Sequence, residues 1–453
     1  VVRFRLKLAD ERLVVGMRMV ADGGSFSDGE QVVLPVLSSK VEVTETIPLV
    51  INGKGNCTFA LDTLFNSRSP QATQRSLTVE MTGNPAWYAV AALPTFDPQR
   101  DENAISWATS LYGHALGLHI VKQNPTIQRM FASWRAQDVE RQALSSRLEQ
   151  QEELKEILLS ESPWVMEAES ETVRQLRIAR FFDENQMDYR LSTAVDKLRQ
   201  LQLPSGAWSW FAGMSGNSYV THLILQQLFR LPMLTGAPLT AASRDMARKG
   251  MNYLHQEAMK RYQERHSKAN SNLRMSASQA DLDYLYLLAI SGEKPDVRQQ
   301  KVVDECLKLW EEARASTSLA QKARLAVVLL AYERMTSAAE VVRSIKEYLT
   351  LSPGRGASFA MKESDVWGMG NISLHVACME ALQRSGGEEA LIEQMKVWLL
   401  QQKQTRSWGQ VVASADAVYA LLMQAGREWT TGGRVLITLG KEQIDTAADE
   451  ALE

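Results

Sequence analysis

The stretch Gly206–Leu228, GAWSWFAGMSGNSYVTHLILQQL, decides the fold because it holds a complete helix-start pattern. Two tryptophans precede a loop of small residues, and Asn217 then stands before a long apolar run. An asparagine in that place can accept hydrogen bonds from the free N–H groups of a helix start. The apolar residues that follow recur at the spacing of one helix face. The stretch therefore predicts a loop, a polar cap and a core helix.

The same order of features returns twice. In Asp365–Leu382 (DVWGMGNISLHVACMEAL), Ser373 lies six residues after a tryptophan, and in Arg406–Leu422 (RSWGQVVASADAVYALL) Ser414 does the same. We expect each serine to cap a helix. We expect each tryptophan to fill the gap between neighbouring helix ends, with its indole N–H on a carbonyl.

The tryptophans of this structural repeat are Trp208, Trp210, Trp367 and Trp408. Trp367 and Trp408 lie 41 residues apart, about one helical hairpin, and Trp210 lies 157 residues before Trp367, close to four such units. A recurrence near 40 residues predicts hairpins whose inner helices run parallel around an axis. The expected fold is therefore mainly α, an α/α toroid, with an open helical solenoid as the alternative.

Helical periodicity extends over residues 96–427, which we assign to the toroid. The expected helices are 106–122, 125–134, 139–159, 171–182, 192–203, 218–231, 241–259, 278–290, 302–313, 319–335, 338–349, 373–383, 390–402 and 414–424. Short turns such as 291–295, 352–356 and 385–387 separate them.

Residues 1–95 have a different sequence pattern, typical of strands. Short segments rich in Val, Thr and Ile predict strands at 12–20, 31–37, 41–50 and 76–81, with turns at Asp22-Gly23-Gly24 and Asp28-Gly29 between them. A strand is expected again at 432–440, within residues 428–453. The toroid would thus be inserted into a β-sandwich-like domain whose halves are distant in sequence.

Charge and composition exclude several classes. The chain has 453 residues, with 50 Lys and Arg against 53 Asp and Glu, and lacks the basic excess that nucleic-acid binding needs. No apolar run is long enough for a transmembrane helix. The chain starts VVRFRLKL, without an initiator methionine, so we expect a piece of a longer polypeptide with any export signal upstream.

The residues that could carry catalysis or bind a metal are scattered. His114 and His119 are five apart on one expected helix, which is poor metal geometry. His375 and Cys378 could share a helix face, but no third ligand follows in register. Neither Asp97 nor Asp101 pairs with a second aspartate on a helix face. We therefore expect no metal, no cofactor and no catalytic residue, and lone histidines that pack in the core or cap helices.

The three cysteines, Cys57, Cys306 and Cys378, lie among apolar neighbours and are expected to be buried thiols. The densely charged segment Val139–Glu161 is expected to form an amphipathic helix with a solvated face, and a partner-binding helix is the alternative.

Several stretches resemble bacterial α2-macroglobulins, the protease-trapping proteins related to the thioester proteins of complement. They are Ser27–Gly53, Asn84–Phe96 (NPAWYAVAALPTF), Asp101–Gly113 (DENAISWATSLYG), Gly206–Leu228, Met395–Leu400 and Arg406–Leu422. The resemblance covers essentially the whole chain. It implies a CUB-like β-domain with linkers, interrupted by the helical toroid that carries the thioester in the family.

In the family, a Cys-x-Glu-Gln motif at the first toroid helix forms that thioester. With Ile105-Ser106 as register, the motif falls on Arg100, Asp101, Glu102 and Asn103, so only the glutamate is kept. No cysteine lies between Cys57 and Cys306, so a shift of register restores no thioester. Glu102 is expected to be a carboxylate at a helix N-terminus.

The resemblance therefore implies a thioester-less inhibitor that encloses endopeptidases non-covalently after a bait region is cut. Its partners would be those endopeptidases and the other domains of the polypeptide, in the periplasm, cell envelope or extracellular space. The alternatives are an envelope scaffold or adhesion protein of the same architecture, and an enzyme built on the toroid.

Overall fold

The chain is mainly helical where the structure, a computed structural model, describes it. The described residues are 14–35, 56, 58–59, 86–97, 102–142, 171–267, 276, 278–352, 355–359, 370–403, 408–424, 436–439 and 441–445. The chain divides into two compact units, residues 1–45 with 133–176 and residues 46–132 with 177–453. The second unit contains the helical ring.

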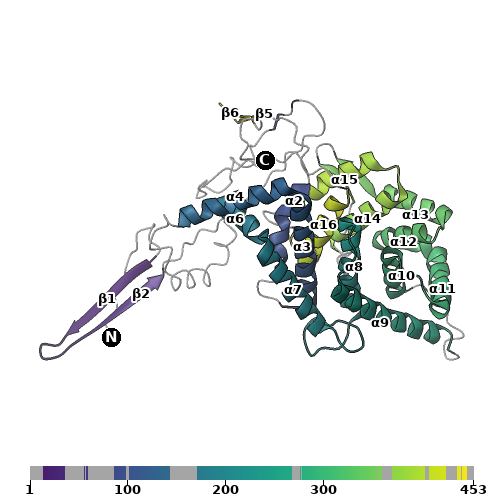
Figure 1. Ribbon diagram of the computed structural model, residues 1–453, viewed down its shortest axis with the longest axis horizontal. Helices are drawn as coiled ribbons and strands as arrows, with labels where there is room; N and C mark the ends of the chain where they lie inside the picture. Colours follow the sequence, from purple (N-terminus) through teal and green to yellow (C-terminus); the bar gives the residue numbers. More distant parts are fainter. Residues whose placement is uncertain are drawn as a thin grey trace. The chain divides into compact units, whose positions relative to one another are not determined.

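Six of the described helices form a closed ring within the second unit (Figure 1). They are α3 (Ala104–Gln123), α8 (Ser218–Thr235), α10 (Gln279–Ser291), α12 (Leu319–Ala331), α14 (Asn371–Ser385) and α16 (Val411–Gln424). Each packs against the next, and α16 returns to pack against α3. The predicted α/α toroid is therefore confirmed, and the open solenoid is wrong because the last inner helix closes on the first.

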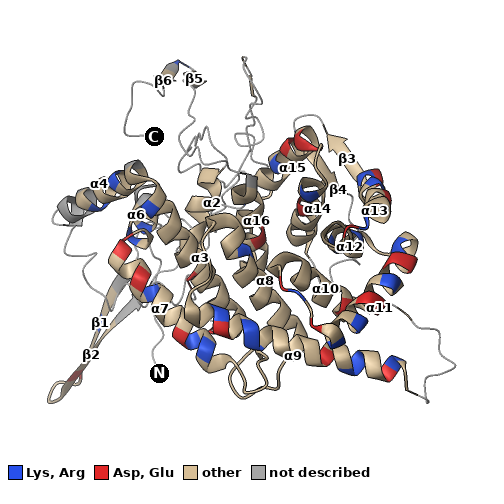
Figure 2. Ribbon diagram, turned by 45° about the vertical axis from the view of Figure 1, so that its right-hand side comes forward, with Lys and Arg blue, Asp and Glu red and all other residues tan. Residues whose placement is uncertain are grey.

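A second helix packs on the outside of each inner helix. The outer helices are α2 (Ala86–Ala92), α7 (Glu184–Leu201), α9 (Ala241–Arg265), α11 (Val297–Ala313), α13 (Met335–Glu347) and α15 (Glu389–Gln401). Figure 2 shows charged residues of both signs along α7, α9, α11 and α13, whereas α8 and α12 carry few. This division is expected when one set of helices lines the core and the other faces water.

The remaining helices are short or lie next to the ring helices in sequence: η1 (Leu93–Phe96), α4 (Pro125–Gln142), α6 (Glu171–Phe181) and η4 (Arg314–Ser316). Of the charged segment 139–161, only residues 139–142 are described, and they belong to α4. No helix in the described part of the chain is long and apolar enough to cross a bilayer.

Polar caps fix the starts of four inner helices. The Asn217 side chain accepts hydrogen bonds from the N–H groups of Tyr219 and Val220, as predicted, and Asn103, Ser278 and Ser318 cap α3, α10 and α12. The predicted caps Ser373 and Ser414 are wrong. Both helices start earlier, so these serines lie inside the first turn or just after it.

The helix spacing is less regular than predicted. The starts of α10 and α12 are 40 residues apart, at Gln279 and Leu319, as are those of α14 and α16, at Asn371 and Val411. Three hairpins, not four, separate α8 from α14 among the described helices. The long helix α9 and the segment before α14 account for the extra residues.

The described strands form three antiparallel pairs. In the first, β1 (Val14–Asp22) pairs with β2 (Ser27–Pro35), and the Asp22 carboxylate accepts from the Gly24 N–H at 2.9 Å in the predicted turn. The predicted second turn at Asp28-Gly29 is wrong, because these residues pair with Ala21 and Val20 and continue the ladder.

The second pair, β3 (Leu349–Ser352) with β4 (Gly356–Phe359), replaces the loop expected between two helices and packs on α15. The third pair is β5 (Leu436–Leu439) with β6 (Glu442–Asp445), and β5 lies within the strand expected at 432–440. The predicted strands 41–50 and 76–81 lie outside the described residues. The β-sandwich and the boundaries at 95/96 and 427/428 therefore stay predictions.

Helix α2 was not predicted, although it lies within the stretch assigned to the β-region. Its sequence, AWYAVAA, is rich in alanine, which favours helix. It packs on α16 and η1.

A close backbone approach fixes the loop before α8. Gly206 has φ +91°, and a Cβ placed there would lie 2.2 Å from the carbonyl oxygen of Lys249 in α9. Gly213, in the same loop, has φ +84° with no atom within 4 Å of the corresponding position.

We predict that Gly206→Ala lowers the free energy of unfolding by about 3 kcal/mol or more, because a backbone clash adds to the strain of positive φ. Gly213→Ala, the matched control, should cost only about 1–2 kcal/mol of φ strain. Urea denaturation of both variants measures the difference. Equal losses would contradict the close approach of Gly206 to α9.

Candidate functional site

The start of α3 is where the thioester motif would lie. Arg100 and Asp101 lie outside the described residues. Asn103 is the N-cap of α3: its side-chain oxygen accepts from the Ser106 N–H at 2.9 Å, and the Ser106 hydroxyl accepts from the Asn103 N–H at 3.0 Å. The Asn103 side chain is therefore engaged in capping the helix.

Glu102 is the residue directly before this cap, at the N-terminal end of α3. Its carboxylate is 64% exposed and lies 3.8 Å from Lys197 of α7. An exposed pair of this kind contributes little to stability.

The tryptophans of the repeat behave in two ways. The indole N–H of Trp208 donates to the Leu198 carbonyl at 2.9 Å, and that of Trp408 donates to the Leu399 carbonyl at 2.7 Å, as expected. Both rings are buried. Trp210 is 38% exposed, and its carbonyl accepts from the N–H of Ala104 at the start of α3. Trp367 lies outside the described residues.

Trp208 and Trp408 each make a second hydrogen bond of the same kind. The backbone N–H of Trp208 donates to the Thr221 hydroxyl at 2.9 Å, and that of Trp408 donates to the Ser414 hydroxyl at 3.1 Å. Thr221 and Ser414 are each the fourth residue of an inner helix. The unit that recurs is thus a tryptophan bound to a hydroxyl of the following helix. The loops between the two residues differ in length, so the sequence spacing does not show the repeat.

The interior of the ring is organised by one arginine. Arg230 of α8 is only 6% exposed; its Nη1 lies 2.5 Å from Asp416 of α16, and its Nη2 lies 3.3 Å from Glu380 of α14. Nη2 also donates to the Tyr286 hydroxyl of α10 at 3.2 Å, and the guanidinium lies over the Tyr419 ring at 4.0 Å. One side chain therefore connects four inner helices.

Glu380 is held from several sides. The Tyr286 hydroxyl donates to Glu380 Oε2 at 2.7 Å, and the Tyr419 hydroxyl donates to Oε1 at 3.1 Å. Arg384, one helical turn later, pairs with Oε1 at 2.9 Å. Such full pairing is what a buried carboxylate requires.

These contacts shift the pKa values of the cluster. Burial alone would raise the pKa of Glu380, but the charges of Arg230 and Arg384 and the Tyr286 hydrogen bond outweigh it and lower the pKa. Burial raises the pKa of Tyr286, so its hydroxyl keeps its proton. Sequence patterns did not predict this cluster, although charged residues inside apolar helix stretches were its signal.

A neighbouring pair extends the polar interior. Arg324 of α12 pairs with Asp283 of α10, next to the fully buried His222 of α8. Burial lowers the pKa of His222 to about 4, so the ring is neutral near pH 7. As expected for a lone histidine, His222 packs in the core.

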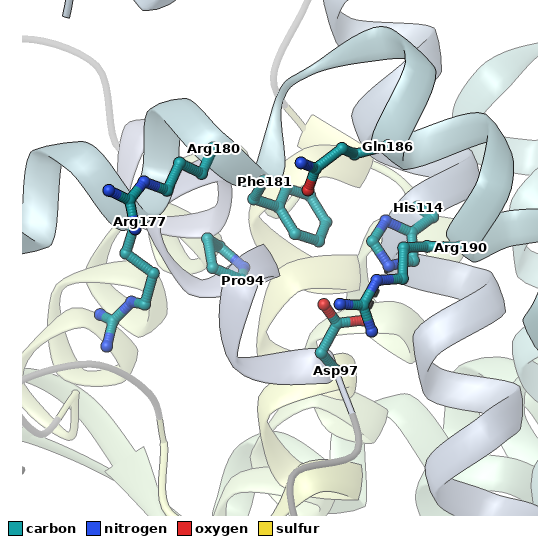
Figure 3. A pocket seen from close by; sticks show the side chains of 8 residues that line it. All are labelled: Pro94, Asp97, His114, Arg177, Arg180, Phe181, Gln186 and Arg190. Carbon is teal, nitrogen blue, oxygen red and sulfur yellow. Dashed lines mark hydrogen bonds and ion pairs between the residues drawn. The ribbon is translucent and has the colours of Figure 1, made fainter. Parts of the chain in front are cut away.

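A separate cavity of about 160 Å³ opens beside α3, at the outside of the ring (Figure 3). It is lined by Pro94, Asp97, His114, Arg177, Arg180, Phe181, Gln186 and Arg190. His114, 2% exposed, has its Nε2 2.7 Å from Asp97 Oδ1, and the same oxygen accepts from the Ser110 hydroxyl at 3.2 Å. No local pattern indicated this pairing, because Asp97 and His114 lie 17 residues apart on different elements.

The histidine that was weighed as a metal ligand and the three cysteines are considered next. His375 Nε2 lies 3.0 Å from the Met395 carbonyl, and its ring is tilted by 35° against the Trp398 ring at 4.3 Å, so a backbone contact holds it. Cys306 and Cys378 are buried free thiols, and Cys57 lies outside the described residues. Within the described ranges no three His, Cys, Asp or Glu side chains lie close enough to hold a metal ion.

We predict that Arg230→Met lowers the free energy of unfolding by about 3–5 kcal/mol, because it leaves the Asp416 and Glu380 carboxylates buried without their cation. Arg248→Met is the control, since Arg248 is 62% exposed in an ion pair with Asp245 and should cost about 0–1 kcal/mol. Chemical denaturation compares the two. A loss at Arg230 no larger than the loss at Arg248 would show that the buried cluster does not stabilise the ring.

We also predict a specific pH dependence for Glu380. Its pKa is lower in the folded chain than the usual 4.5, so its charge stabilises the fold above about pH 4.5, and this contribution is lost as the pH falls further. The difference in unfolding free energy between the wild type and Glu380→Gln should therefore shrink as the pH falls below 4.5. A difference that stays constant from pH 7 to pH 3 would contradict a charged Glu380.

Comparison with solved structures yields a distant likeness. No protein-family model matches the chain, and no curated protein matches it. The chain is similar to the crystal structure of native alpha-2-macroglobulin from Escherichia coli, spanning domain MG7 to the C-terminus, with 16% identity and a TM-score of 0.38. The match covers 58% of this chain and 38% of that chain. A likeness at this level does not indicate a shared function.

Proposed function

We propose that this chain is part of an endopeptidase inhibitor of the α2-macroglobulin type that encloses proteases without a covalent bond. The observation that carries the proposal is the sequence at residues 100–103, where Arg-Asp-Glu-Asn replaces Cys-x-Glu-Gln inside stretches that otherwise resemble the family. An acyl bond to sulfur needs a thiol, and position 100 has none.

The start of α3 supports a non-covalent role. The Asn103 side chain caps the helix instead of offering its carboxamide for acyl transfer. The two described cysteines lie in α11 and α14, and burial raises the pKa of Cys306 to about 12 and also raises the pKa of Cys378. A nucleophilic cysteine needs a thiolate, so these residues are suited to packing.

The interior of the ring supports a structural role for the toroid. Side chains of Arg230, Tyr286, Glu380 and Tyr419 occupy the space between the inner helices and bind one another. A ring whose helices are joined by these hydrogen bonds and ion pairs would move as one rigid body when the full polypeptide changes conformation. In this proposal the toroid docks on neighbouring β-domains and shifts when the bait region is cut.

The wider assignments belong to the same proposal. The proposed domains are a CUB-like and linker β-region at residues 1–95 and 428–453 and a toroid at residues 96–427. The bait region would lie elsewhere in the polypeptide. The proposed location is the periplasm or another part of the cell envelope. The partners would be endopeptidases and the other domains of the polypeptide.

The test uses the full-length polypeptide incubated with several endopeptidases. We predict that the trapped protease loses most of its activity on a large protein substrate and keeps it on a small peptide substrate, because enclosure excludes only large molecules. Loss of both activities, or of neither, would contradict a steric trap. Neither activity would change with an envelope scaffold or adhesion protein.

The control for the absence of a thioester is a thiol titration of this chain in denaturant. The three cysteines should all react, both before and after methylamine treatment. A thioester would hide one thiol until methylamine released it, and that result would contradict non-covalent capture.

A further inference from the structure

We propose that the helical ring is an acid-sensitive element, which loosens when two buried histidines of its inner helices take up protons in mildly acidic solution. The two histidines are His222 of α8 and His375 of α14, and they are 2% and 1% exposed. The inference does not depend on the proposed function.

His222 lacks the contact that would stabilise a second proton on its ring. In the described part of the chain, neither of its ring nitrogens bonds to a carboxylate or to the backbone, and its ring lies 6.1 Å from the Tyr286 ring. His114 is the contrast, because it is also 2% exposed but has a carboxylate, that of Asp97, 2.7 Å from its Nε2. A charge on a buried ring without such a partner is unfavourable, since water cannot solvate it.

The charges inside the ring are already balanced. The ion pairs between described residues of the inner helices contain three arginines and three carboxylates: Arg230, Arg324, Arg384, Asp283, Glu380 and Asp416. A proton on His222 would add a positive charge for which this set contains no further anion. Protonation therefore disturbs the cluster that joins the inner helices.

The groups that face His222 come from three helices. Asp283 of α10 and Gln226 of α8 favour a charged ring. Burial, together with the charges of Arg324 of α12 and Arg230 of α8, outweighs them and lowers the pKa of His222 to about 4. The ring is therefore neutral while the fold is intact near neutral pH.

His375 is a second site of the same kind. Its Nε2 donates to the Met395 carbonyl at 3.0 Å, and its Nδ1 has no hydrogen-bond partner in the described residues. A second proton, on Nδ1, would thus have no acceptor. Burial lowers the pKa of His375 to about 4, although the Met395 hydrogen bond raises it, and no charged side chain of the described residues contributes. Burial also raises the pKa of Cys378, one helical turn later, so this thiol stays neutral.

The pH range of the effect follows from the two states of each histidine. In the unfolded chain a histidine takes up its proton near pH 6.5, whereas in the folded ring these two do so only near pH 4. Below pH 6.5 the unfolded chain therefore binds more protons, and stability falls as the pH falls towards 4. Between pH 7 and pH 5 each histidine should raise the unfolding equilibrium constant about 20-fold.

The carboxylates of the interior do not confuse this range. The opposite charges and hydrogen bonds around Asp283 and Glu380 outweigh burial and lower the pKa of both, so they stay ionised at pH 5. The effect of the histidines thus precedes the loss of the Glu380 charge on acidification.

The test is urea unfolding of the full 453-residue chain at pH 7 and at pH 5, for the wild type, His222→Gln and His375→Gln. Glutamine takes up no proton, so we predict that the rise in the unfolding constant from pH 7 to pH 5 is about 20-fold smaller in each variant. Each protein is compared with itself at two pH values, so a loss of stability common to both does not affect the result. His266→Gln is the control, because His266 is 41% exposed and lies 3.1 Å from Glu305, and it should keep the wild-type pH dependence.

Amide hydrogen exchange locates the loosening. Corrected for the intrinsic rate at each pH, the protection of α8 and α14 should fall from pH 7 to pH 5 in the wild type, and fall less in the two variants. Wild-type pH dependence in both His222→Gln and His375→Gln, or an equal reduction in His266→Gln, would overturn the proposal. Circular dichroism at pH 7 checks folding, and His222→Asn or His375→Asn repeats the test where a glutamine variant does not fold.

Discussion

The buried guanidinium of Arg230 is the interaction on which the ring depends. A guanidinium cannot lose its proton at accessible pH, so its burial obliges carboxylates and hydroxyls to surround it. Asp416, Glu380 and Tyr286 meet this demand from three other inner helices. A ring of hairpins held only by apolar contacts could slide or open, whereas these directional bonds fix which helix faces which.

The ends of the helices are fixed by a different set of contacts. Asn103 and Asn217 cap α3 and α8, and Trp208 and Trp408 join the loop before an inner helix both to its fourth residue and to the preceding outer helix. Caps and indoles act at the ring's rim, and the Arg230 cluster acts inside it. Together they explain how helices of unequal spacing close into one ring.

Local patterns predicted the parts of the fold that depend on neighbours in sequence. Apolar periodicity located the long helices, and Asn217 marked the start of α8, because both are properties of a single segment. The caps at Ser373 and Ser414 were wrong because a serine near a helix start can serve another element, as Ser414 serves Trp408. The Arg230 cluster and the Asp97–His114 pair join residues 186 and 17 positions apart, and no local pattern encodes such contacts.

Under the proposed function, the residues at the start of α3 have a structural consequence as well as a chemical one. In a thioester protein, the motif's carboxamide must be free to acylate a cysteine, so it cannot also satisfy the helix N–H groups. Here the shorter Asn103 side chain accepts from the Ser106 N–H, and a shorter polar residue is the better cap. In the thioester-less inhibitor that we propose, no thiol at position 100 requires a free carboxamide at position 103, so Asn103 can stabilise the first helix of the ring as its cap.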